Sequence, residues 1–315
     1  MKWCYLFSGQ GAQKAGYLSD AISKYDYLTD NIKVAEKITG YPLEMIFKFG
    51  PQEILNQTIF TQLFLYIYGT TLADLIEKQT NFRPSYLAGL SVGEYTACCY
   101  SGVFSYEEGI KLVFHRANLM HKSCIVKKGT MFALIGADIE LVKNFCSKLS
   151  RYGIIEIANY NADNQVVIGC EQHLKEKVLR EYRDSGIKKA IELKVEGAFH
   201  TSLMEYANQN LSYYLDKIKL NHPRIPIISN VTARDEIEPE EIRENLKKQT
   251  TSYVRWYESI LYLKGKDVTN FVELGPGGVL SDLVKRTHPD AKVYKIDNLI
   301  DLENLIDSIK ALSGL

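Results

Sequence analysis

Short apolar runs and longer stretches of helical pattern follow one another along the chain. The first apolar run, Trp3–Phe7, ends in a turn rich in glycine and glutamine, and a second, Tyr86–Leu90, ends in a Gly-Leu-Ser-Val-Gly segment. Apolar runs of this length bounded by turn residues are typical of buried strands. Residues 20–80 between them are predicted to be mostly helical. Within that region Gln62–Ile76 is apolar nearly all round, which predicts a buried helix.

The pattern changes after Lys128, where shorter elements follow one another closely. Their order is β-α-β-β-α-β, which is typical of a ferredoxin-like unit. We therefore predict an inserted small subdomain over residues 128–194. Its expected strands are Thr130–Ile135, Ile154–Ala158, Val166–Ile168 and Ala190–Leu193, its expected helices are Asp138–Leu149 and Glu171–Asp184, and Asn159–Asn164 is expected to connect the two middle strands.

From Val195 onward strands and helices alternate again. This alternation predicts a largely parallel sheet with helices around it. The fold class is therefore α/β, with an α/β-hydrolase-like large domain formed by residues 1–127 and 195–315. The expected helices of its second part are Ser202–Ile218, Glu238–Lys248, Val279–Arg286 and Leu299–Leu312, and the expected strands are Ile225–Ser229, Phe271–Leu274 and Val293–Ile296.

The segment Gly89-Leu90-Ser91-Val92-Gly93 lies between a predicted strand and a predicted helix. This is the context of a nucleophile elbow, in which a serine stands on a sharp turn at the carboxyl edge of a sheet. The flanking glycines tolerate the strained backbone of such a turn. The helix that follows offers unpaired N–H groups and a positive dipole to a developing oxyanion. A lone G-x-S-x-G motif is weak, so the serine needs further support.

A serine hydroxyl is a poor nucleophile without an adjacent base. Among six histidines, His200 stands between a predicted strand and a predicted helix, where a loop can reach the elbow. Arg116 lies on an otherwise apolar helix, so either a protein carboxylate or a ligand anion must pair with it. The glycines around Gln10 form a turn whose N–H groups either face a ligand or only connect a strand to a helix.

Composition and charge exclude several functions. The 315 residues carry 38 basic and 38 acidic side chains, so no global charge favours nucleic acid or a membrane surface. The N-terminal apolar stretch is too short for a secretion signal, and no apolar run approaches the length of a membrane span. The six cysteines show no C-x-x-C spacing and are expected to be reduced and buried. We predict a cytoplasmic monomer without nucleic-acid or membrane partners and without a metal.

Six motifs in this order resemble the malonyl-CoA:acyl carrier protein transacylase family, including the discrete acyltransferases that serve polyketide synthases in trans. The resemblance covers nearly the whole chain, and the ordered set is far more specific than any single motif. The motifs are Phe7-Ser8-Gly9-Gln10-Gly11-Ala12-Gln13, Gly89–Tyr95, His115-Arg116-Ala117, Gly197-Ala198-Phe199-His200, Ile228-Ser229-Asn230-Val231-Thr232 and Glu273–Leu280.

The resemblance implies a role for each of five residues. Ser91 would be the acylated nucleophile and His200 its base. A backbone carbonyl, at the position of Gln249, would orient the histidine in place of an aspartate. The backbone N–H groups of Gln10 and Val92 would form the oxyanion hole. The substrate would be malonyl-CoA, and no cofactor would be needed.

The resemblance also implies how the substrates are recognised. Arg116 would bind the free carboxylate of the malonyl group, and Phe199 and Met120 would contact the acyl group. One charge-assisted guanidinium–carboxylate pair contributes about 1.5–3 kcal/mol, a selection of roughly tenfold to a hundredfold over acetyl. Phe199 would narrow the pocket against 2-branched acyl groups. Acidic carrier proteins would dock on Lys285 and Arg286, and Lys188, Lys189 and Lys194 of the small subdomain could add to that basic rim.

Two residues depart from the family pattern. Leu90 stands where the family usually has histidine, and Ser8 stands where it usually has proline.

Two other functions stay open. The first alternative is an acyl hydrolase of the same family that would share Ser91 and His200 but need not bind a carboxylate. The second is a non-catalytic carrier-binding scaffold. Fatty acid and polyketide synthesis both remain open as the pathway.

Overall fold

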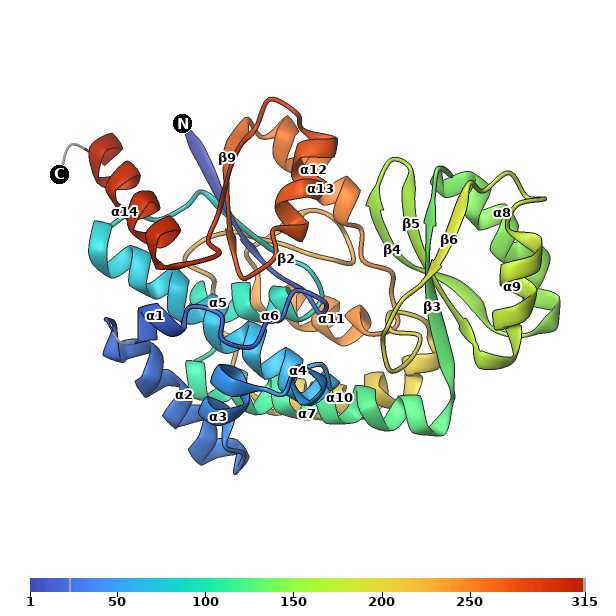
Figure 1. The fold of residues 1–315 in the computed structure, drawn as a ribbon, viewed down its shortest axis with the longest axis horizontal. Coiled ribbons are helices and arrows are strands. Elements are labelled where there is room, and N and C mark those ends of the chain that lie inside the picture. Colours follow the sequence, from blue (N-terminus) through green and yellow to red (C-terminus); the bar gives the residue numbers. More distant parts are fainter. Residues whose placement is uncertain (23, 314–315) are drawn as a thin grey trace.

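A six-stranded sheet forms the centre of the larger unit in the computed structural model, which describes residues 1–22 and 24–313 (Figure 1). Its order is β10-β9-β1-β2-β7-β8, and every neighbouring pair is parallel except β7 and β8. The largely parallel sheet is thus confirmed, with an unpredicted edge strand, β8. The strands are β1 (Lys2–Phe7), β2 (Tyr86–Gly89), β7 (Ile227–Ile228), β8 (Asp235–Glu236), β9 (Val268–Leu274) and β10 (Lys292–Lys295).

Both faces of the central strands of this sheet are buried, which explains why β1 is apolar at every position from Trp3 to Phe7. In β1, Trp3, Tyr5 and Phe7 face one core, and Cys4 and Leu6 between them face a second one. Helices cover each face and hold the carboxyl ends of the strands in place. The first core includes α5 (Thr58–Thr80) and α6 (Val92–Tyr100), and the second includes α12 (Trp256–Gly265) and α13 (Val279–Thr287).

The remaining helices of the large unit enclose these two layers. A capping box begins α7, because the Ser105 hydroxyl and the Glu108 carboxylate each accept the other residue's backbone N–H. The remaining helices are α1 (Ser19–Ile22), α2 (Asp26–Thr39), α3 (Leu43–Phe49), α4 (Gln52–Leu55), α7 (Tyr106–Val126), α10 (Glu205–Lys217), α11 (Pro239–Gln249) and α14 (Leu299–Ser313).

Helix α5 corrects one expectation. It has 23 residues and is long and apolar enough, by length and composition alone, to cross a membrane, so the statement that no run approaches that length was wrong. The helix is longer than the predicted stretch because Thr58–Thr61 precede that stretch and Glu77–Thr80 follow it in the same helix. Of its most apolar window, 89% is buried inside the molecule, as in the core helix of a globular fold.

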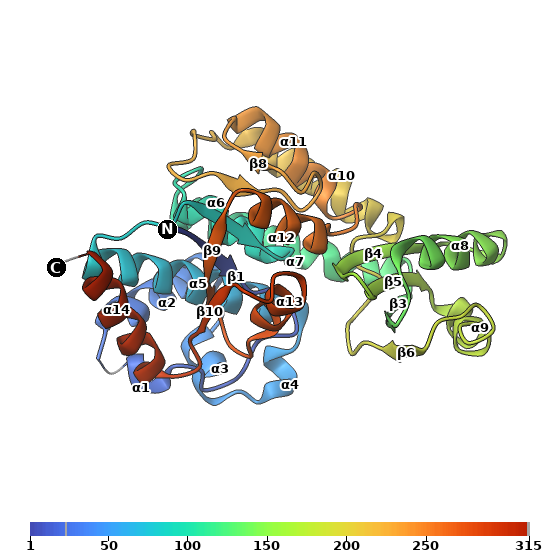
Figure 2. The same ribbon diagram turned by 90° about the horizontal axis from the view of Figure 1, so that it is seen from above.

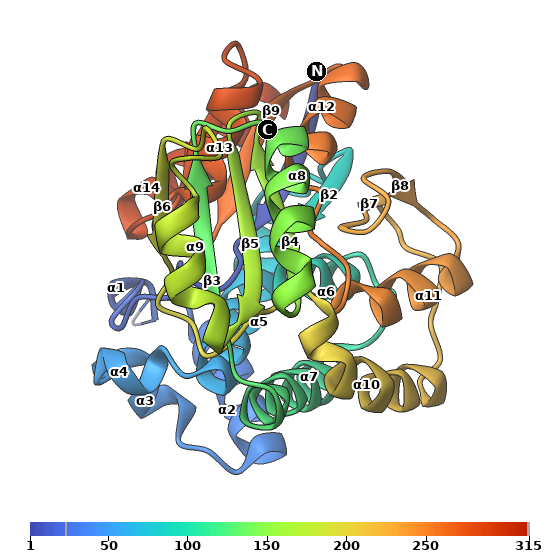
Figure 3. The same ribbon diagram turned by 90° about the vertical axis from the view of Figure 1, so that its right-hand side faces the viewer.

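The smaller unit lies at one end of the larger one, as two views at right angles show (Figures 1 and 2). Its four strands are antiparallel in the order β4-β5-β3-β6, and α8 and α9 cover one face (Figure 3). This arrangement agrees with the predicted ferredoxin-like subdomain. The elements are β3 (Gly129–Ile135), α8 (Ile139–Leu149), β4 (Ile155–Ala162), β5 (Gln165–Glu171), α9 (Lys175–Glu181) and β6 (Lys189–Glu192).

Strand β4 is longer than predicted, because it continues through Asn159, Tyr160 and Asn161. These residues were expected to form a loop. Asn159 and Tyr160 pair with Val167 and Val166 of the neighbouring strand β5, so the two strands form a longer hairpin than expected. A segment of the large unit pairs with β4 on its other side: the N–H of Tyr160 donates to the carbonyl of Val254 at 2.9 Å, and the N–H of Val254 donates to that of Ala158. This second contact joins residues almost a hundred positions apart, so the local pattern could not predict it.

The helix expected over Glu171–Asp184 begins later than predicted. Glu171 still belongs to β5, because its backbone N–H donates to the carbonyl of Ile154 at 3.0 Å and its carboxylate accepts the N–H of Ile154 at 2.8 Å. A short 3₁₀ turn over Gln172–Leu174 then leads into α9. The charged residues after Glu171 did not locate the helix start, because the contacts that keep Glu171 in β5 come from Ile154, directly before β4.

Candidate active site

The elbow around Ser91 has the tight geometry that its sequence predicts. Ser91 has φ 59° and ψ −108°, a backbone conformation that side-chain-bearing residues rarely adopt. A Cβ added at Gly89 would lie 2.0 Å from the backbone of Gly93, and one added at Gly93 would lie 2.1 Å from the carbonyl oxygen of Phe7. Both glycines are therefore required by close contact of β1, β2 and α6.

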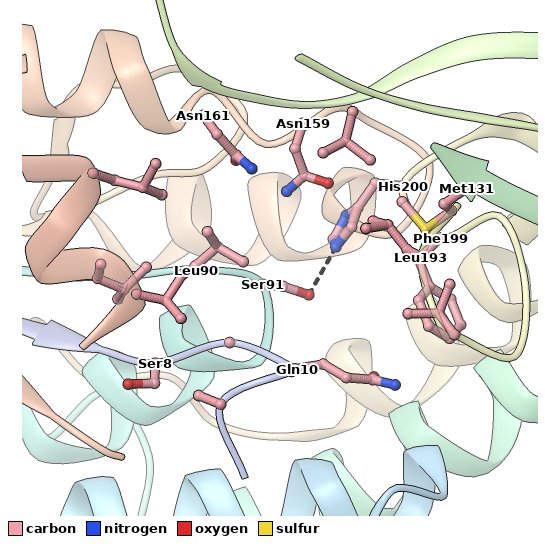
Figure 4. Close-up of a pocket in the computed structure, with 18 of the residues that line it drawn as sticks. Ser8, Gln10, Leu90, Ser91, Met131, Asn159, Asn161, Leu193, Phe199 and His200 are labelled. Carbon is pink, nitrogen blue, oxygen red and sulfur yellow. Dashed lines mark hydrogen bonds between the residues drawn. The ribbon is translucent and has the colours of Figure 1, made fainter. Parts of the chain in front are cut away.

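Ser91, His200 and Gln249 lie in one hydrogen-bonded line (Figure 4 shows the first two). The Ser91 Oγ is 2.7 Å from Nε2 of His200, and Nδ1 of the same ring is 2.9 Å from the backbone oxygen of Gln249. Because a carbonyl oxygen can only accept, Nδ1 carries the proton and Nε2 presents its lone pair to the serine. This is the arrangement of a serine with its general base.

Contacts from both units hold His200. The residue has φ 60°, and the segment after it is anchored by Glu156 of β4, whose carboxylate accepts the Ser202 N–H at 2.7 Å and its hydroxyl at 2.8 Å. His200 is 4% exposed. Burial lowers the pKa of this imidazole to about 4, and the nearby charge of Arg116 adds to the effect. His200 is therefore a neutral base at pH 7.

Arg116 reaches the serine from α7. Its Nη2 donates to the Ser91 Oγ and to Oε1 of Gln249, both at 2.9 Å, and Nη1 donates to Oε1 of Gln62 at 2.7 Å. The side chain is fully buried, and all three acceptors are neutral. Among the residues that the structure describes, no carboxylate forms an ion pair with this guanidinium, and its Nε–H has no acceptor. A guanidinium without a direct ion-pair partner next to Ser91 fits an anionic group on the substrate.

Two backbone N–H groups near Ser91 are free to receive an oxyanion. The N–H of Ser91 itself is occupied, because it donates to Oδ1 of Asn230 at 2.7 Å. Within residues 1–22 and 24–313, no acceptor takes the N–H of Val92 at the start of α6 or that of Gln10 in the turn after β1. Gln10 also lines the cavity above the serine (Figure 4). Both groups are therefore unpaired donors, as the predicted oxyanion hole requires.

The cavity over Ser91 lies between the two units and has a volume of about 210 Å³. Met120 and Phe199 line it, as expected for contacts with an acyl group. Most of the remaining wall is apolar. Asn159 and Asn161 of β4 face it from the small unit (Figure 4), and Oδ1 of Asn161 has no hydrogen-bond partner among the described residues. The walls suit a narrow, mostly apolar chain with a few amide groups.

The basic residues expected at a docking surface are exposed but partly occupied. Lys285 donates to the carbonyl oxygens of Pro289 and Ala291, close to its own helix. Arg286 donates to Oε1 of Gln165 at 2.7 Å and so bridges α13 to the small unit. The lysines of the small subdomain that were expected to add to this surface, Lys188, Lys189 and Lys194, are exposed.

Three polar residues that support the site received no role from the sequence. Gln62 interrupts an apolar helix and accepts from Arg116; its isolated polarity was the available signal. Asn230 occurs in one of the quoted motifs and donates its side-chain N–H to the carbonyl of Gly89 at 2.6 Å. Glu94 directly follows the elbow and lies 1% exposed behind Ser91. Burial raises the pKa of Glu94, and the amide of Gln249 opposes that shift.

The two departures from the family pattern both have a structural explanation. Leu90 lines the cavity with an apolar side chain and leaves the contact between Ser91 and His200 intact. The Ser8 hydroxyl donates to the Glu273 carboxylate at 3.1 Å in the core. That carboxylate also accepts the N–H groups of Leu280 and Ser281 at the start of α13. A serine therefore ties β1 to β9 and α13.

Comparisons with known proteins cover almost the whole chain. A family described as the acyl transferase domain matches residues 4–301. The chain is 33% identical over 299 residues to the malonyl CoA-acyl carrier protein transacylase of Haemophilus influenzae, covering 95% of this chain and 96% of that protein. A type II polyketide synthase acyl-carrier protein in complex with its malonyl-transacylase gives a TM-score of 0.94 at 30% identity, covering 98% of this chain and 100% of that one. The malonyl CoA-acyl carrier protein transacylase of Coxiella burnetii also gives 0.94, at 29% identity and 98% coverage of both chains.

Proposed function

Because this chain belongs to the acyl transferase domain family, we propose that it transfers the malonyl group of malonyl-CoA to the phosphopantetheine thiol of an acyl carrier protein through a malonyl-Ser91 intermediate. The observation that carries the proposal is the contact of Ser91 with both His200, at 2.7 Å, and an unpaired guanidinium, at 2.9 Å. A base activates the serine, and the fixed cation selects an acyl group with a free carboxylate.

The first half-reaction forms an ester and releases CoA. Nε2 of His200 takes the Ser91 proton as the oxygen attacks the thioester carbonyl. The N–H groups of Gln10 and Val92 stabilise the oxyanion, and the tetrahedral intermediate collapses to malonyl-Ser91 as the protonated His200 returns the proton to the CoA thiolate. The backbone oxygen of Gln249 holds the ring in the required tautomer.

The second half-reaction repeats these steps with the carrier thiol as nucleophile. His200 takes the thiol proton, the thiolate attacks the ester, and Ser91 leaves with the proton that His200 returns. The scheme needs no metal or redox group. A cytoplasmic, monomeric enzyme remains part of the proposal, and so do the roles of Lys285 and Arg286 in carrier docking.

The Arg116 charge argues against an editing acyl hydrolase, which has no need of a carboxylate-binding cation. The test measures malonyl transfer to a holo carrier protein while both substrates are varied, together with malonyl-CoA hydrolysis without carrier. The proposal predicts ping-pong kinetics and transfer much faster than hydrolysis. Faster hydrolysis, with acetyl and malonyl thioesters cleaved alike, would favour the hydrolase. Comparing a fatty acid carrier with a polyketide carrier as acceptor would then identify the pathway.

A further inference from the structure

A buried network behind Ser91 connects the nucleophile to the malonyl-binding cation, and Glu94 is at its centre. Oε1 of Glu94 accepts the backbone N–H of Asn230 at 3.2 Å, and Oε2 accepts from Nε2 of Gln249 at 2.5 Å. The side chain lies on α6, three residues after the nucleophile, and is 1% exposed. Its two amide partners each contact Ser91, so both oxygens of one buried carboxyl group act on the active site.

The amide of Gln249 has two ends with opposite functions. Its Nε2 donates to the Glu94 carboxyl group and, at 3.0 Å, to the backbone oxygen of Ser91, while its Oε1 accepts from Arg116 at 2.9 Å. Rotating the amide by half a turn would place an NH₂ group against the guanidinium and an oxygen against the Glu94 carboxyl group. Glu94 therefore favours the orientation in which Arg116 meets a carbonyl oxygen.

That orientation matters for an anionic substrate. A neutral amide oxygen holds the guanidinium next to Ser91 without neutralising its charge. A carboxylate in its place would form an ion pair and compete with the substrate, and an NH₂ group would repel the cation. The Gln249 side chain is thus a neutral group between the positive Arg116 and the acidic Glu94. Glu94 holds its amide in the orientation in which Oε1 faces Arg116.

We propose that Glu94 is a positioning residue that sets the preference for a carboxylate-bearing acyl group by orienting the side chain of Gln249 against Arg116. The proposal rests on the proposed malonyl transfer and adds a determinant of its specificity. Glu94 touches neither substrate nor the reacting atoms. Its second contact, through Asn230 to the N–H of Ser91, predicts an additional loss of rate that is shared by all acyl groups.

The experiment compares malonyl-CoA with acetyl-CoA as donors to the same holo carrier protein. Acetyl lacks the carboxylate, so it reports on Ser91 and His200 alone. In Glu94→Gln only one side-chain oxygen remains for two amide donors, so the Gln249 amide loses its fixed orientation. We expect kcat/KM for malonyl to fall roughly three- to tenfold more than that for acetyl. The extra loss should appear in KM for malonyl-CoA.

Exchanging the two side chains separates positioning from simple packing. The double variant Glu94→Gln with Gln249→Glu keeps an amide and a carboxyl group hydrogen-bonded to each other, but it places the carboxylate against Arg116. We expect malonyl transfer to fall further than in Glu94→Gln while acetyl transfer recovers. If the pair served packing alone, the exchange would restore both activities together.

Asp74 provides a control. It is partly buried on α5, and its carboxyl group accepts from the Tyr27 hydroxyl at 2.9 Å without contacting Glu94, Gln249 or Arg116. Asp74→Asn should leave the malonyl-to-acetyl ratio unchanged even if it lowers stability. If Glu94→Gln does not fold cooperatively in a thermal melt, Gln249→Met replaces it. That variant keeps the backbone oxygen that binds His200, and the same fall in the ratio is expected.

The results distinguish this proposal from the proposed function. If the natural protein transfers no malonyl group, the proposed function fails. If it transfers malonyl but Glu94→Gln or its replacement lowers both donors by the same factor, or neither, Glu94 does not set the specificity and only the present inference is overturned.

Discussion

The chemistry of single residues depends on how each is buried. Burial keeps His200 neutral, while Arg116 keeps its charge because a guanidinium loses its proton far less readily. Arg116 has three neutral acceptors and no acidic partner among the described residues. A neutral base and a cation without a direct ion-pair partner around one hydroxyl group are what transfer of an anionic acyl group requires.

Replacing Arg116 tests the source of the malonyl preference. In Arg116→Ala we expect the malonyl-to-acetyl ratio of kcat/KM to fall roughly tenfold to a hundredfold, because one charge-assisted pair to the carboxylate is lost. Arg116→Lys should recover only part of the ratio, since an ammonium group cannot form the planar two-bond contact. Unfolding curves provide the control for stability. An unchanged ratio in Arg116→Ala would remove this residue from substrate recognition.

The lowered pKa of His200 gives a pH prediction. The imidazole loses its function as a base only when protonated, so acylation by acetyl-CoA should persist as pH falls from 7 to 5 and decline through about pH 4. An unperturbed histidine, with a pKa of about 6.5, would already lose activity near pH 6. The measurement is kcat/KM against pH, with circular dichroism to confirm folding. A midpoint near 6.5 would contradict the burial argument.

The same shift affects stability. The unfolded chain protonates His200 near its ordinary pKa of about 6.5, whereas the folded chain resists protonation down to about 4. The unfolded state therefore binds more protons between these values, and the contribution of His200 to the free energy of unfolding falls as pH drops from about 6.5 to about 4. Chemical denaturation at several pH values measures the free energy of unfolding, which should change less between about pH 6.5 and 4 in His200→Gln than in the natural protein. An equal pH dependence in the two proteins would be inconsistent with the lowered pKa of His200.

At the scale of elements, the elbow depends on the close approach of α6 to β1. Gly93→Ala should lower the free energy of unfolding by about 3 kcal/mol or more, because its Cβ would lie 2.1 Å from the Phe7 carbonyl oxygen and backbone would have to move. Gly265→Ala is the matched control, since no atom outside its neighbours lies within 4 Å of the added Cβ. Urea denaturation of both variants measures the difference. Similar stabilities would mean that the elbow tolerates a wider spacing.

The elements themselves could largely be predicted from local patterns. Apolar runs in β1 and β9 and the capping box of α7 are visible within a few residues. The contact of β4 with Val254 could not be predicted in this way, because Val254 belongs to the other unit. The extension of β4 through Asn161 pairs with β5 nearby in the sequence, and the asparagines in it gave the pattern of a loop. Helix α12 was not expected either. Local pattern specifies an element best where its partners are close in sequence.

The site residues also divide into those that the sequence could predict and those that depend on distant contacts. Motifs and the family resemblance gave Ser91, His200, Arg116 and the backbone of Gln249, and the structure brings all four together. The roles of Gln62, Glu94 and the Gln249 side chain depend on contacts between residues more than fifty positions apart in most cases. The sequence shows that a polar residue lies within an apolar segment, but only the fold shows what that residue contacts.

At the scale of the whole molecule, the cavity opens between two units, and a carrier protein must deliver its thiol there. Reversing the charges of Lys285 and Arg286 to Glu should raise the apparent KM for an acidic carrier protein and leave malonyl-CoA hydrolysis unchanged. The matched control reverses Lys33 and Lys37, exposed residues of α2, which makes the same change in net charge. The effect should weaken at high salt. Equal KM values in both double variants would place carrier docking elsewhere.

The central claim is that one serine carries the malonyl group between two thiols, and mapping the acylated residue tests it most directly. The purified protein is incubated with labelled malonyl-CoA without carrier, digested, and its peptides are analysed by mass spectrometry. The account predicts label on Ser91 alone, discharge of that label on addition of a holo carrier protein, and none in Ser91→Ala. Transfer to the carrier without label on Ser91, or stable label on another residue that the carrier discharges, would contradict it.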